Sequence, residues 1–422
     1  MIDHTDRSDL RPEDAVAAFA RGSYNGMMHY RRFGRTELRM PVFSCGGMRY
    51  QHSWNDVKPD EIPAEGQANL EATIRRALEL GINHIETARG YGSSEMQLGR
   101  ILPTLPREEL IVQTKVSPRE TAAEFVQTFE TSLAMLKLDY VDLFSLHGIN
   151  TPELLEWSLR PGGCLEAALG LQREGRVRHV GFSTHASRAV ILEAIETGEF
   201  DYVNLHWYWV NNRNWPAIEA ATRHDMGVFL ISPNDKGGKL YAPPEKLVRL
   251  CAPLSPMEFN DLYCLLRPEI HTLSVGAARP ADFDAHLAAL EKWDAALPLV
   301  PGIDTRLRAE MARVLGTDWL ARWEQGLPEW DAIPGGVNVW EILRLANYAK
   351  SLDLVEFGKM RYNLLGQADH WFPGFPAGEF DDATMRAAVA ASPFAEEIPA
   401  RLREAHALLF DRPVERLSKS GD

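Results

Sequence analysis

The chain has 422 residues, 45% of them hydrophobic, and its formal net charge is −14 at pH 7. This length and composition provide a core for one large and one smaller domain and argue against global disorder. The excess of acidic residues argues against nucleic acid and anionic membrane surfaces as partners, because both are negatively charged.

The cysteine content and the N-terminal residues predict a cytoplasmic protein. The four cysteines form no C-x-x-C pair, and their spacing suits neither a zinc site nor a disulfide framework. Such usage is typical of a reducing compartment. The chain is charged from Asp3 onward without an apolar run of signal-peptide length, and no segment approaches the roughly 18 apolar residues of a membrane span. We therefore expect no membrane partner and no bound metal.

The first predicted elements are a polar extension over residues 1–28, ordered only where it docks on the body, and a hairpin within residues 28–47. The hairpin leads into a buried strand near residues 41–45. Helical patterns separate the later apolar runs. Seven of these runs predict strands, at residues 82–86, 109–116, 140–147, 177–183, 201–207, 227–232 and 271–276.

The clearest helix is predicted to begin at the sequence "SPRE", residues 117–120. Ser117 can cap this helix, Pro118 suits its first position, and Glu120 completes a capping box. Apolar residues then recur with helical spacing as far as Leu136.

Short apolar strands that alternate with amphipathic helices predict a parallel sheet in an α/β fold. Counting the strand near residues 41–45, eight such units predict a (β/α)8 TIM barrel over residues 29–296. An open doubly wound sheet is the alternative, but no G-x-G-x-x-G follows the first strand. Strand-like runs then cease, and residues 297–422 predict a helical C-terminal domain. Its clearest helices are expected at residues 339–351, 383–391 and 398–410.

Four reactive side chains follow neighbouring strands of the predicted barrel. Glu86 ends the second strand, Tyr91 lies in the next loop, Lys115 is near the end of the third, and His147 ends the fourth. Each has a structural alternative: a Glu86–Lys115 ion pair, a solvated tyrosine hydroxyl, or an interior histidine. Because active sites of such barrels lie at the carboxyl ends of the strands, the four together predict an active site.

The sequence "ETARGYGSSE", residues 86–95, resembles D-T-A-x-x-Y-G-x-S-E, the hallmark of the aldo-keto reductases. In this resemblance Lys115 and His147 match the family's lysine and histidine. The resemblance covers about residues 29–292. It implies an NAD(P)-dependent oxidoreductase that transfers a hydride between a nicotinamide and a small carbonyl, alcohol or sugar.

The resemblance also implies a role for each of the four side chains. Tyr91 is expected to give a proton during reduction and to take one during oxidation, and Lys115 to lower its pKa. His147 is expected to orient the substrate oxygen. Glu86 would hold Lys115 in place; the family usually has aspartate there, which is one methylene shorter but has the same charge.

The nicotinamide site implied by the resemblance lies at the fifth and sixth strands. Ser183, Thr184 and Asn204 match the polar residues that bind the carboxamide of the nicotinamide. Ser183 and Thr184 have an alternative reading as caps of the following helix. Ile231 stands where the family often has a tyrosine that stacks on the nicotinamide, so this stack is expected to be missing.

The phosphate site implied by the resemblance lies after the seventh and eighth strands. Ser232, Lys236 and Gly238 belong to the segment that resembles the family's phosphate-binding loop. Arg279 is the cation available for a 2′-phosphate, although Asp282 nearby would repel one. We expect NADP(H), with NAD(H) as the alternative.

Aromatic residues predict either a pocket lining or packing between the barrel and the tail. They are Trp54 in the loop after the first strand, and Trp207, Tyr208, Trp209 and Trp215 after the sixth. The tail itself, at residues 324–351, resembles the ferredoxin-like domain that one branch of the family carries. Cysteine is absent from residues 265–422, so no Fe–S cluster of this type can be ligated there. We interpret the tail as a former Fe–S domain that now serves as packing or as a lid over the barrel.

Two other functions remain compatible with these residues. One is a binding protein that senses the redox state of the nicotinamide without catalysis. The other is an isomerase or lyase that holds NAD tightly. Tyr91, Lys115 and His147 together favour catalysis, because a sensor has little need of a proton donor.

Overall fold

The computed structural model describes residues 23–24 and 28–414. Most of the predicted polar extension, residues 1–22 and 25–27, therefore lies outside the described residues, as do residues 415–422. Strand β1 (Ser23–Tyr24) pairs antiparallel with β2 (Met28–Arg32), and β2 pairs with β3 (Arg39–Pro41). The β2–β3 pair is the hairpin predicted before the first barrel strand.

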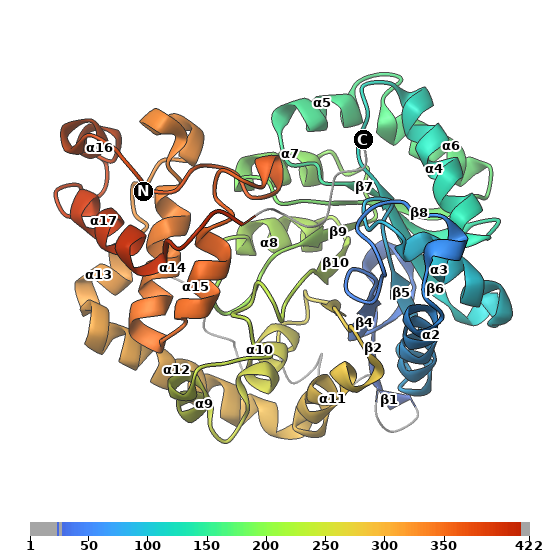
Figure 1. Cartoon of the computed structure of the whole chain (residues 1–422), viewed down its shortest axis with the longest axis horizontal. Coiled ribbons are helices and arrows are strands. Elements are labelled where there is room, and N and C mark those ends of the chain that lie inside the picture. Colours follow the sequence, from blue (N-terminus) through green and yellow to red (C-terminus); the bar gives the residue numbers. More distant parts are fainter. Residues whose placement is uncertain (1–22, 25–27, 415–422) are drawn as a thin grey trace.

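Eight parallel strands close into a barrel in the order β10-β11-β4-β5-β6-β7-β8-β9, which confirms the predicted (β/α)8 barrel (Figure 1). All residues of these strands except Arg178 and His179 are buried, because the barrel interior covers one face and the helices cover the other. Each predicted strand is present, and most are one or more residues shorter than predicted. Their bounds are β4 (Phe43–Gly46), β5 (His84–Glu86), β6 (Ile111–Val116), β7 (Val141–His147), β8 (Val177–Ser183), β9 (Tyr202–Leu205), β10 (Gly227–Leu230) and β11 (Thr272–Val275).

Helices follow the barrel strands and pack around them (Figure 1). One follows most strands, and two follow β7 and β10. Their bounds are α2 (Ala64–Glu79), α3 (Ser94–Ile101), α4 (Ala122–Leu136), α5 (Pro152–Leu159), α6 (Cys164–Arg173), α7 (Arg188–Glu196), α8 (Trp215–Arg223), α9 (Glu245–Cys251), α10 (Pro256–Leu265) and α11 (Asp284–Glu291).

Helix α4 begins later than predicted, so the expectation of a start at Ser117 is wrong. Its N-cap is Thr121, whose hydroxyl accepts a hydrogen bond from the Glu124 backbone N–H at 3.3 Å and donates one to the Glu124 carboxylate at 2.8 Å. Thr121 and Glu124 form a second cap signal directly after Ser117 and Glu120, and the structure uses this second one, while residues 117–120 connect β6 to the helix.

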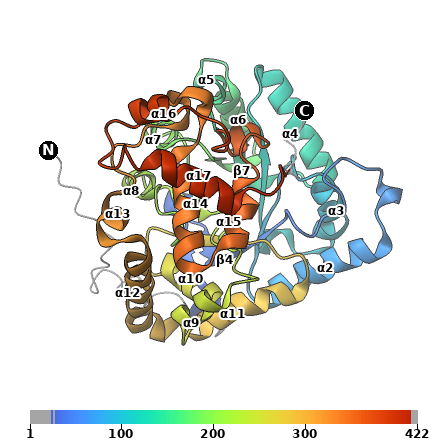
Figure 2. The same cartoon turned by 60° about the vertical axis from the view of Figure 1, so that its left-hand side comes forward.

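The remaining helices, which we call the C-terminal helices, form a lobe beside the barrel (Figures 1 and 2). Side chains join the two parts: Trp209 Nε1 donates to Asp304 Oδ1 at 2.6 Å, and Arg344 donates to the Val210 oxygen at 2.7 Å. The helices predicted at 339–351, 383–391 and 398–410 correspond to α14, α16 and α17. The bounds are α12 (Ala296–Leu315), α13 (Thr317–Arg322), α14 (Val339–Leu352), α15 (Val355–Tyr362), α16 (Asp382–Ala388) and α17 (Ile398–Leu409).

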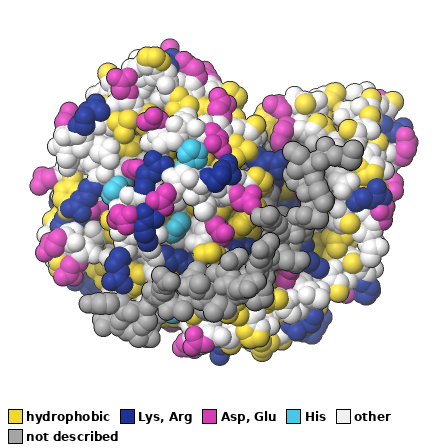
Figure 3. Space-filling view, turned by 180° about the vertical axis from the view of Figure 1, so that it is seen from behind, with side chains coloured by type: hydrophobic (Ala, Val, Ile, Leu, Met, Phe, Trp, Pro, Cys, Tyr) yellow, Lys and Arg dark blue, Asp and Glu magenta, His cyan; other side chains and the backbone are white. Residues whose placement is uncertain are grey.

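The surface of the molecule mixes charges of both signs. Acidic and basic side chains are interspersed over the described residues of the face in Figure 3, so the net negative charge is not gathered into one patch there. Within the described part of the chain, no helix combines the length and the apolar character that crossing a membrane requires.

Candidate functional site

The four reactive side chains predicted at the strand ends lie together at one end of the barrel. Glu86 ends β5, Lys115 is the fifth residue of β6, and His147 ends β7. Because β5, β6 and β7 are hydrogen-bonded neighbours, their carboxyl ends bring these groups to one place. Tyr91, in the loop between β5 and α3, has only 9% of its surface exposed, and the other three are also buried.

Lys115 is the centre of this group. Its ammonium forms an ion pair with the Glu86 carboxylate and donates hydrogen bonds to the Thr87 backbone oxygen at 2.8 Å and to the Tyr91 hydroxyl at 3.3 Å. Burial lowers the pKa of Lys115 well below its usual value. The ion pair with the Glu86 carboxylate acts against this effect of burial, because a nearby negative charge favours the protonated ammonium.

Tyr91 is held in a tight turn by its neighbours. Gly92 has a φ of 55°, and a Cβ at this position would lie 2.1 Å from the Ser53 backbone oxygen, so the turn requires glycine. The tyrosine hydroxyl lies 3.4 Å from Glu86 Oε1, and its ring meets the His147 ring edge-on with 5.8 Å between centroids. The phenol is therefore fixed between a carboxylate, an ammonium and an imidazole.

A cavity of about 360 Å³ opens above these groups. The barrel and the C-terminal helices both contribute to its wall. The Trp371 ring lies edge-on to His147, with 4.9 Å between centroids, and to His185 at 5.2 Å. The residues that the C-terminal part of the chain contributes to the lining are Met360, Arg361, Leu364, Ala368, Trp371, Phe372 and Val414.

The residues predicted to bind the nicotinamide differ in their surroundings. Ser183 lines the cavity, and its hydroxyl accepts a hydrogen bond from the Gly148 N–H at 3.0 Å. Thr184 does not line it: its hydroxyl donates to the Ile149 oxygen at 2.8 Å and accepts from the Ala186 N–H at 3.1 Å. Asn204 pairs with Ser183 in the sheet and is fully buried, and neither of its amide atoms has a hydrogen-bond partner among the described residues.

The residues predicted to bind phosphate are only partly brought together. Ser232 and Lys236 line the cavity, whereas Gly238 and Arg279 do not. Arg279 has 73% of its side chain exposed and donates to Asp282 Oδ1 at 3.1 Å. The Lys236 ammonium lies 3.1 Å from His206 Nε2. Burial lowers the pKa of His206 well below its usual value, with Lys236 acting in the same direction, so this imidazole is neutral.

Arg49, His185, Arg361 and Trp371 are among the cavity residues that were not predicted from the sequence. Arg49, in the loop after β4, lies over the Tyr241 ring at 5.1 Å and against Gly276. His185 directly follows the strand-end pair Ser183 and Thr184, and this position was a signal that could have revealed it. Arg361 lies on α15 and Trp371 in the segment between α15 and α16, and both reach the cavity only through tertiary packing.

Of the two roles predicted for the aromatic residues after β9, pocket lining and packing, the cavity lining supports the second, because none of the four lines the cavity. Trp207 stacks on the Tyr263 ring with 5.3 Å between centroids, and Trp209 meets the ring of Tyr348 on α14 at 5.6 Å. Trp209 thus packs the barrel against a C-terminal helix, as the packing alternative predicts, whereas Trp207 packs on α10 of the barrel itself. Trp54 does line the cavity.

Similarity to known proteins decides the family. The model of the Aldo/keto reductase family matches residues 44–236. The chain is 30% identical over 326 residues to L-galactose dehydrogenase of Arabidopsis thaliana, and the match covers 70% of this chain and 97% of that protein. The chain belongs to the aldo/keto reductase family.

Other relatives of this aldo/keto reductase match over shorter regions. An aldo-keto reductase of Mycobacterium avium is 34% identical over 210 residues, 49% of this chain. The chain spans 56% and 66% of the length of two curated relatives that it matches. The solved structure of an aldo-keto reductase from Bacillus halodurans has the same fold, with a TM-score of 0.54 at 22% identity over 66% of this chain and 96% of that one.

Within the described ranges, no group of three or more histidine, cysteine, aspartate or glutamate residues is arranged to hold a metal ion. The cavity brings together a phenol beside a buried ammonium and a neighbouring imidazole. The Asn204 amide does not line this cavity; it is fully buried behind Ser183, its neighbour in the sheet.

Proposed function

We propose that this aldo/keto reductase transfers a hydride between NADP(H), or alternatively NAD(H), and the carbonyl or alcohol carbon of a small molecule. One observation carries this proposal. The Tyr91 hydroxyl lies 3.3 Å from the ammonium of the buried, ion-paired Lys115, at the base of a cavity that both parts of the chain line.

The proposed role of Tyr91 is to move the proton. A free tyrosine has a pKa of about 10, too high for ready proton exchange near neutral pH. The adjacent Lys115 ammonium favours the phenolate, which makes the hydroxyl a better acid. In reduction Tyr91 gives its proton to the carbonyl oxygen, and in oxidation it takes the proton of the alcohol.

His147 and Glu86 support the same step. The His147 imidazole, edge-on to Tyr91, is close enough to hydrogen-bond an oxygen that the tyrosine also reaches, which orients the substrate and stabilises the charge that develops there. Glu86 keeps Lys115 charged and directed at the hydroxyl. When bound, the nicotinamide supplies or accepts the hydride.

The buried Asn204 amide fits a nicotinamide carboxamide. Both its oxygen and its nitrogen lack a partner among the described residues, and a buried amide without partners costs free energy. A carboxamide offers one donor group and one acceptor that complement them. Ser183, its neighbour across the sheet, lines the cavity beside it.

Replacing Asn204 with leucine, which is similar in size, should raise the free energy of unfolding of the nucleotide-free protein by about 1–3 kcal/mol, because an unsatisfied buried amide is removed. The same change should weaken nucleotide binding about tenfold, the loss expected for about one hydrogen bond. Thermal unfolding with and without NADPH measures both effects. A rise in Tm with NADPH that is equal in the two proteins would contradict the assignment.

Two arginines bear on the choice between NADP(H) and NAD(H). Arg279, assigned to a 2′-phosphate by the resemblance, is exposed and forms an ion pair with Asp282. To bind a 2′-phosphate, its guanidinium must first release this carboxylate. Arg49 lines the cavity beside Gly276 and stacks on Tyr241. Both cations support NADP(H), and Arg49 is the one already in the cavity.

A panel of aldehydes, ketones and sugars, monitored at the nicotinamide absorbance with NADPH and with NADH, tests the proposed function. We expect carbonyl-dependent oxidation of at least one nucleotide. Turnover of an alcohol or carbonyl without added nucleotide would instead indicate tightly held NAD. Nucleotide binding without any turnover would support the non-catalytic alternative.

A further inference from the structure

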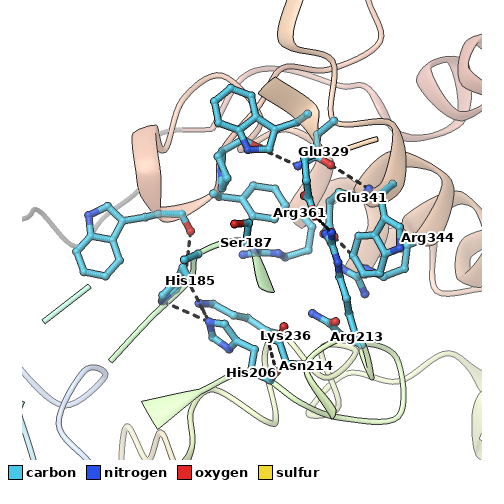
Figure 4. A pocket seen from close by; sticks show the side chains of 18 residues that line it. His185, Ser187, His206, Arg213, Asn214, Lys236, Glu329, Glu341, Arg344 and Arg361 are labelled. Carbon is cyan, nitrogen blue, oxygen red and sulfur yellow. Dashed lines mark hydrogen bonds and ion pairs between the residues drawn. The ribbon is translucent and has the colours of Figure 1, made fainter. Parts of the chain in front are cut away.

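A second cavity of about 110 Å³ lies between the barrel and the C-terminal helices, beside the cavity that contains Tyr91 (Figure 4). Its barrel side is formed by the loops after β8, β9 and β10. Its other side is formed by α14, α15 and the chain that precedes and follows them. A cavity needs about 10–15 Å³ of such volume to hold one water molecule, so this cavity has room for a carboxylate or a phosphate group and some water.

Positive charge exceeds negative charge in the lining of this second cavity. Arg213 forms an ion pair with Glu329, and Arg344 forms one with Glu341, so a carboxylate balances the charge of each of these two arginines. Figure 4 shows the cations converging from the barrel loops and from the C-terminal helices. The lining has four cationic side chains and two carboxylates: Arg213, Lys236, Arg344, Arg361, Glu329 and Glu341.

Arg361, on α15, is the cation of the second cavity whose charge is least compensated by its neighbours. Among the described residues its guanidinium has no hydrogen bond and no ion pair, and it stacks on the Phe372 ring at 3.9 Å. Burial lowers the pKa of Arg361, which reflects the cost of holding this charge away from water. A guanidinium presents five N–H donors in a planar fork that matches a carboxylate or a phosphate.

The two cavities share part of their lining. The residues that border both are His185, Lys236, Arg361, Trp371 and Phe372. The Trp371 ring lies edge-on to both His147 and His185, with 4.9 and 5.2 Å between centroids. The cavity that contains Tyr91 and His147 thus borders the second cavity along these shared residues, and a molecule with its carbonyl at Tyr91 can place its other end toward Arg361.

We propose that the second cavity binds the anionic group, a carboxylate or a phosphate, of the carbonyl substrate, with Arg361 as its principal ligand. This assignment rests on the proposed function, because it names the class of molecule that the same enzyme reduces. A cofactor phosphate is the other source of an anion with this chemistry, and the experiment below separates the two.

The test compares carbonyl compounds that differ only in an anionic group: succinic semialdehyde with butanal, and glycolaldehyde phosphate with glycolaldehyde. For the wild-type protein, kcat/KM should be at least about tenfold higher for the anionic member of one pair. Charge-assisted hydrogen bonds to a guanidinium contribute enough for such a factor. In Arg361→Gln, the ratio of the two kcat/KM values should fall at least about tenfold, and Arg361→Lys should retain part of it.

Lys359→Gln is the matched control, because it removes one positive charge from the same helix at a position outside both cavities. Its ratio should equal that of the wild type. An unchanged ratio in Arg361→Gln, or an equal fall in Lys359→Gln, would overturn the assignment. A nucleotide Kd raised tenfold in Arg361→Gln, with the substrate ratio unchanged, would assign the cavity to a cofactor phosphate and would also overturn it.

Calorimetric titration with inorganic phosphate and with succinate provides a readout that does not depend on turnover. The wild-type protein and Lys359→Gln should bind one of these anions when nucleotide is saturating, and Arg361→Gln should bind it at least about tenfold more weakly. If no carbonyl is reduced but this binding pattern is found, the proposed function fails and the anion site stands. If the carbonyl panel succeeds but no anion binds, the anion site fails and the proposed function stands.

Discussion

Replacement of Tyr91 with phenylalanine is expected to lower kcat by about 10²–10⁴-fold, the usual contribution of a general acid or base. The change removes one oxygen and leaves the ring, which packs edge-on against His147. Nucleotide binding should therefore change little. Steady-state kinetics with the best carbonyl of the panel, together with a fluorescence titration of the nucleotide, measures both quantities.

Tyr140→Phe is a matched control for this experiment. Tyr140 directly precedes β7, whereas His147 ends it, so the two lie at opposite ends of one barrel strand. The Tyr140 hydroxyl accepts a hydrogen bond from the exposed Arg178, and its loss should leave kcat nearly unchanged. If Tyr91→Phe kept more than about a tenth of the wild-type kcat, Tyr91 would not be the proton donor.

The barrel could be predicted because each of its strands is a short apolar run between helical patterns. Residues 177–183 form β8 with the predicted bounds, and 140–147 form β7 with one residue fewer. Once the strands were known, barrel geometry alone brought Glu86, Lys115 and His147 to neighbouring strand ends.

The part of the Tyr91 cavity that is lined by the C-terminal part of the chain could not be predicted in the same way. Trp371 lies more than 200 residues beyond His147 in the sequence, and no period or motif links the two. Its position depends on how the C-terminal helices dock on the barrel, and this docking uses buried contacts such as the Arg344 hydrogen bond to Val210. Trp207 and Trp209 show the same limit, because an aromatic residue after a strand can face a pocket or a neighbouring helix.

The history of the C-terminal helices remains a prediction. In the resemblance to the ferredoxin-like branch, Trp330 and Ile333 match two of the four cysteine positions that ligate a cluster there. Ile333 is buried, and Trp330 lines the second cavity together with Arg361. Under the proposals above, the segment that resembles a cluster-binding loop now closes one side of a substrate site.

Replacement of Lys115 with methionine is expected to lower the free energy of unfolding by about 3–5 kcal/mol, the cost of leaving one buried charge of an ion pair without its partner. The Glu86 carboxylate is only 3% exposed and loses its counter-ion, while Thr87 loses a hydrogen bond to its backbone oxygen. Urea unfolding of the full-length protein at pH 7 measures this loss. An unfolding free energy equal to that of the wild type would show that the ion pair contributes nothing to stability.

The double variant Glu86→Leu/Lys115→Met separates stability from catalysis. Both charges are removed together, and replacing a buried ion pair with hydrophobic side chains of similar size is often neutral for stability, so most of the loss should be recovered. The Tyr91 hydroxyl then has no ammonium beside it, and kcat should stay as low as in Lys115→Met alone. A stable double variant with wild-type kcat would mean that Lys115 holds the fold together without acting on Tyr91, and the proposed proton transfer would then need another cation.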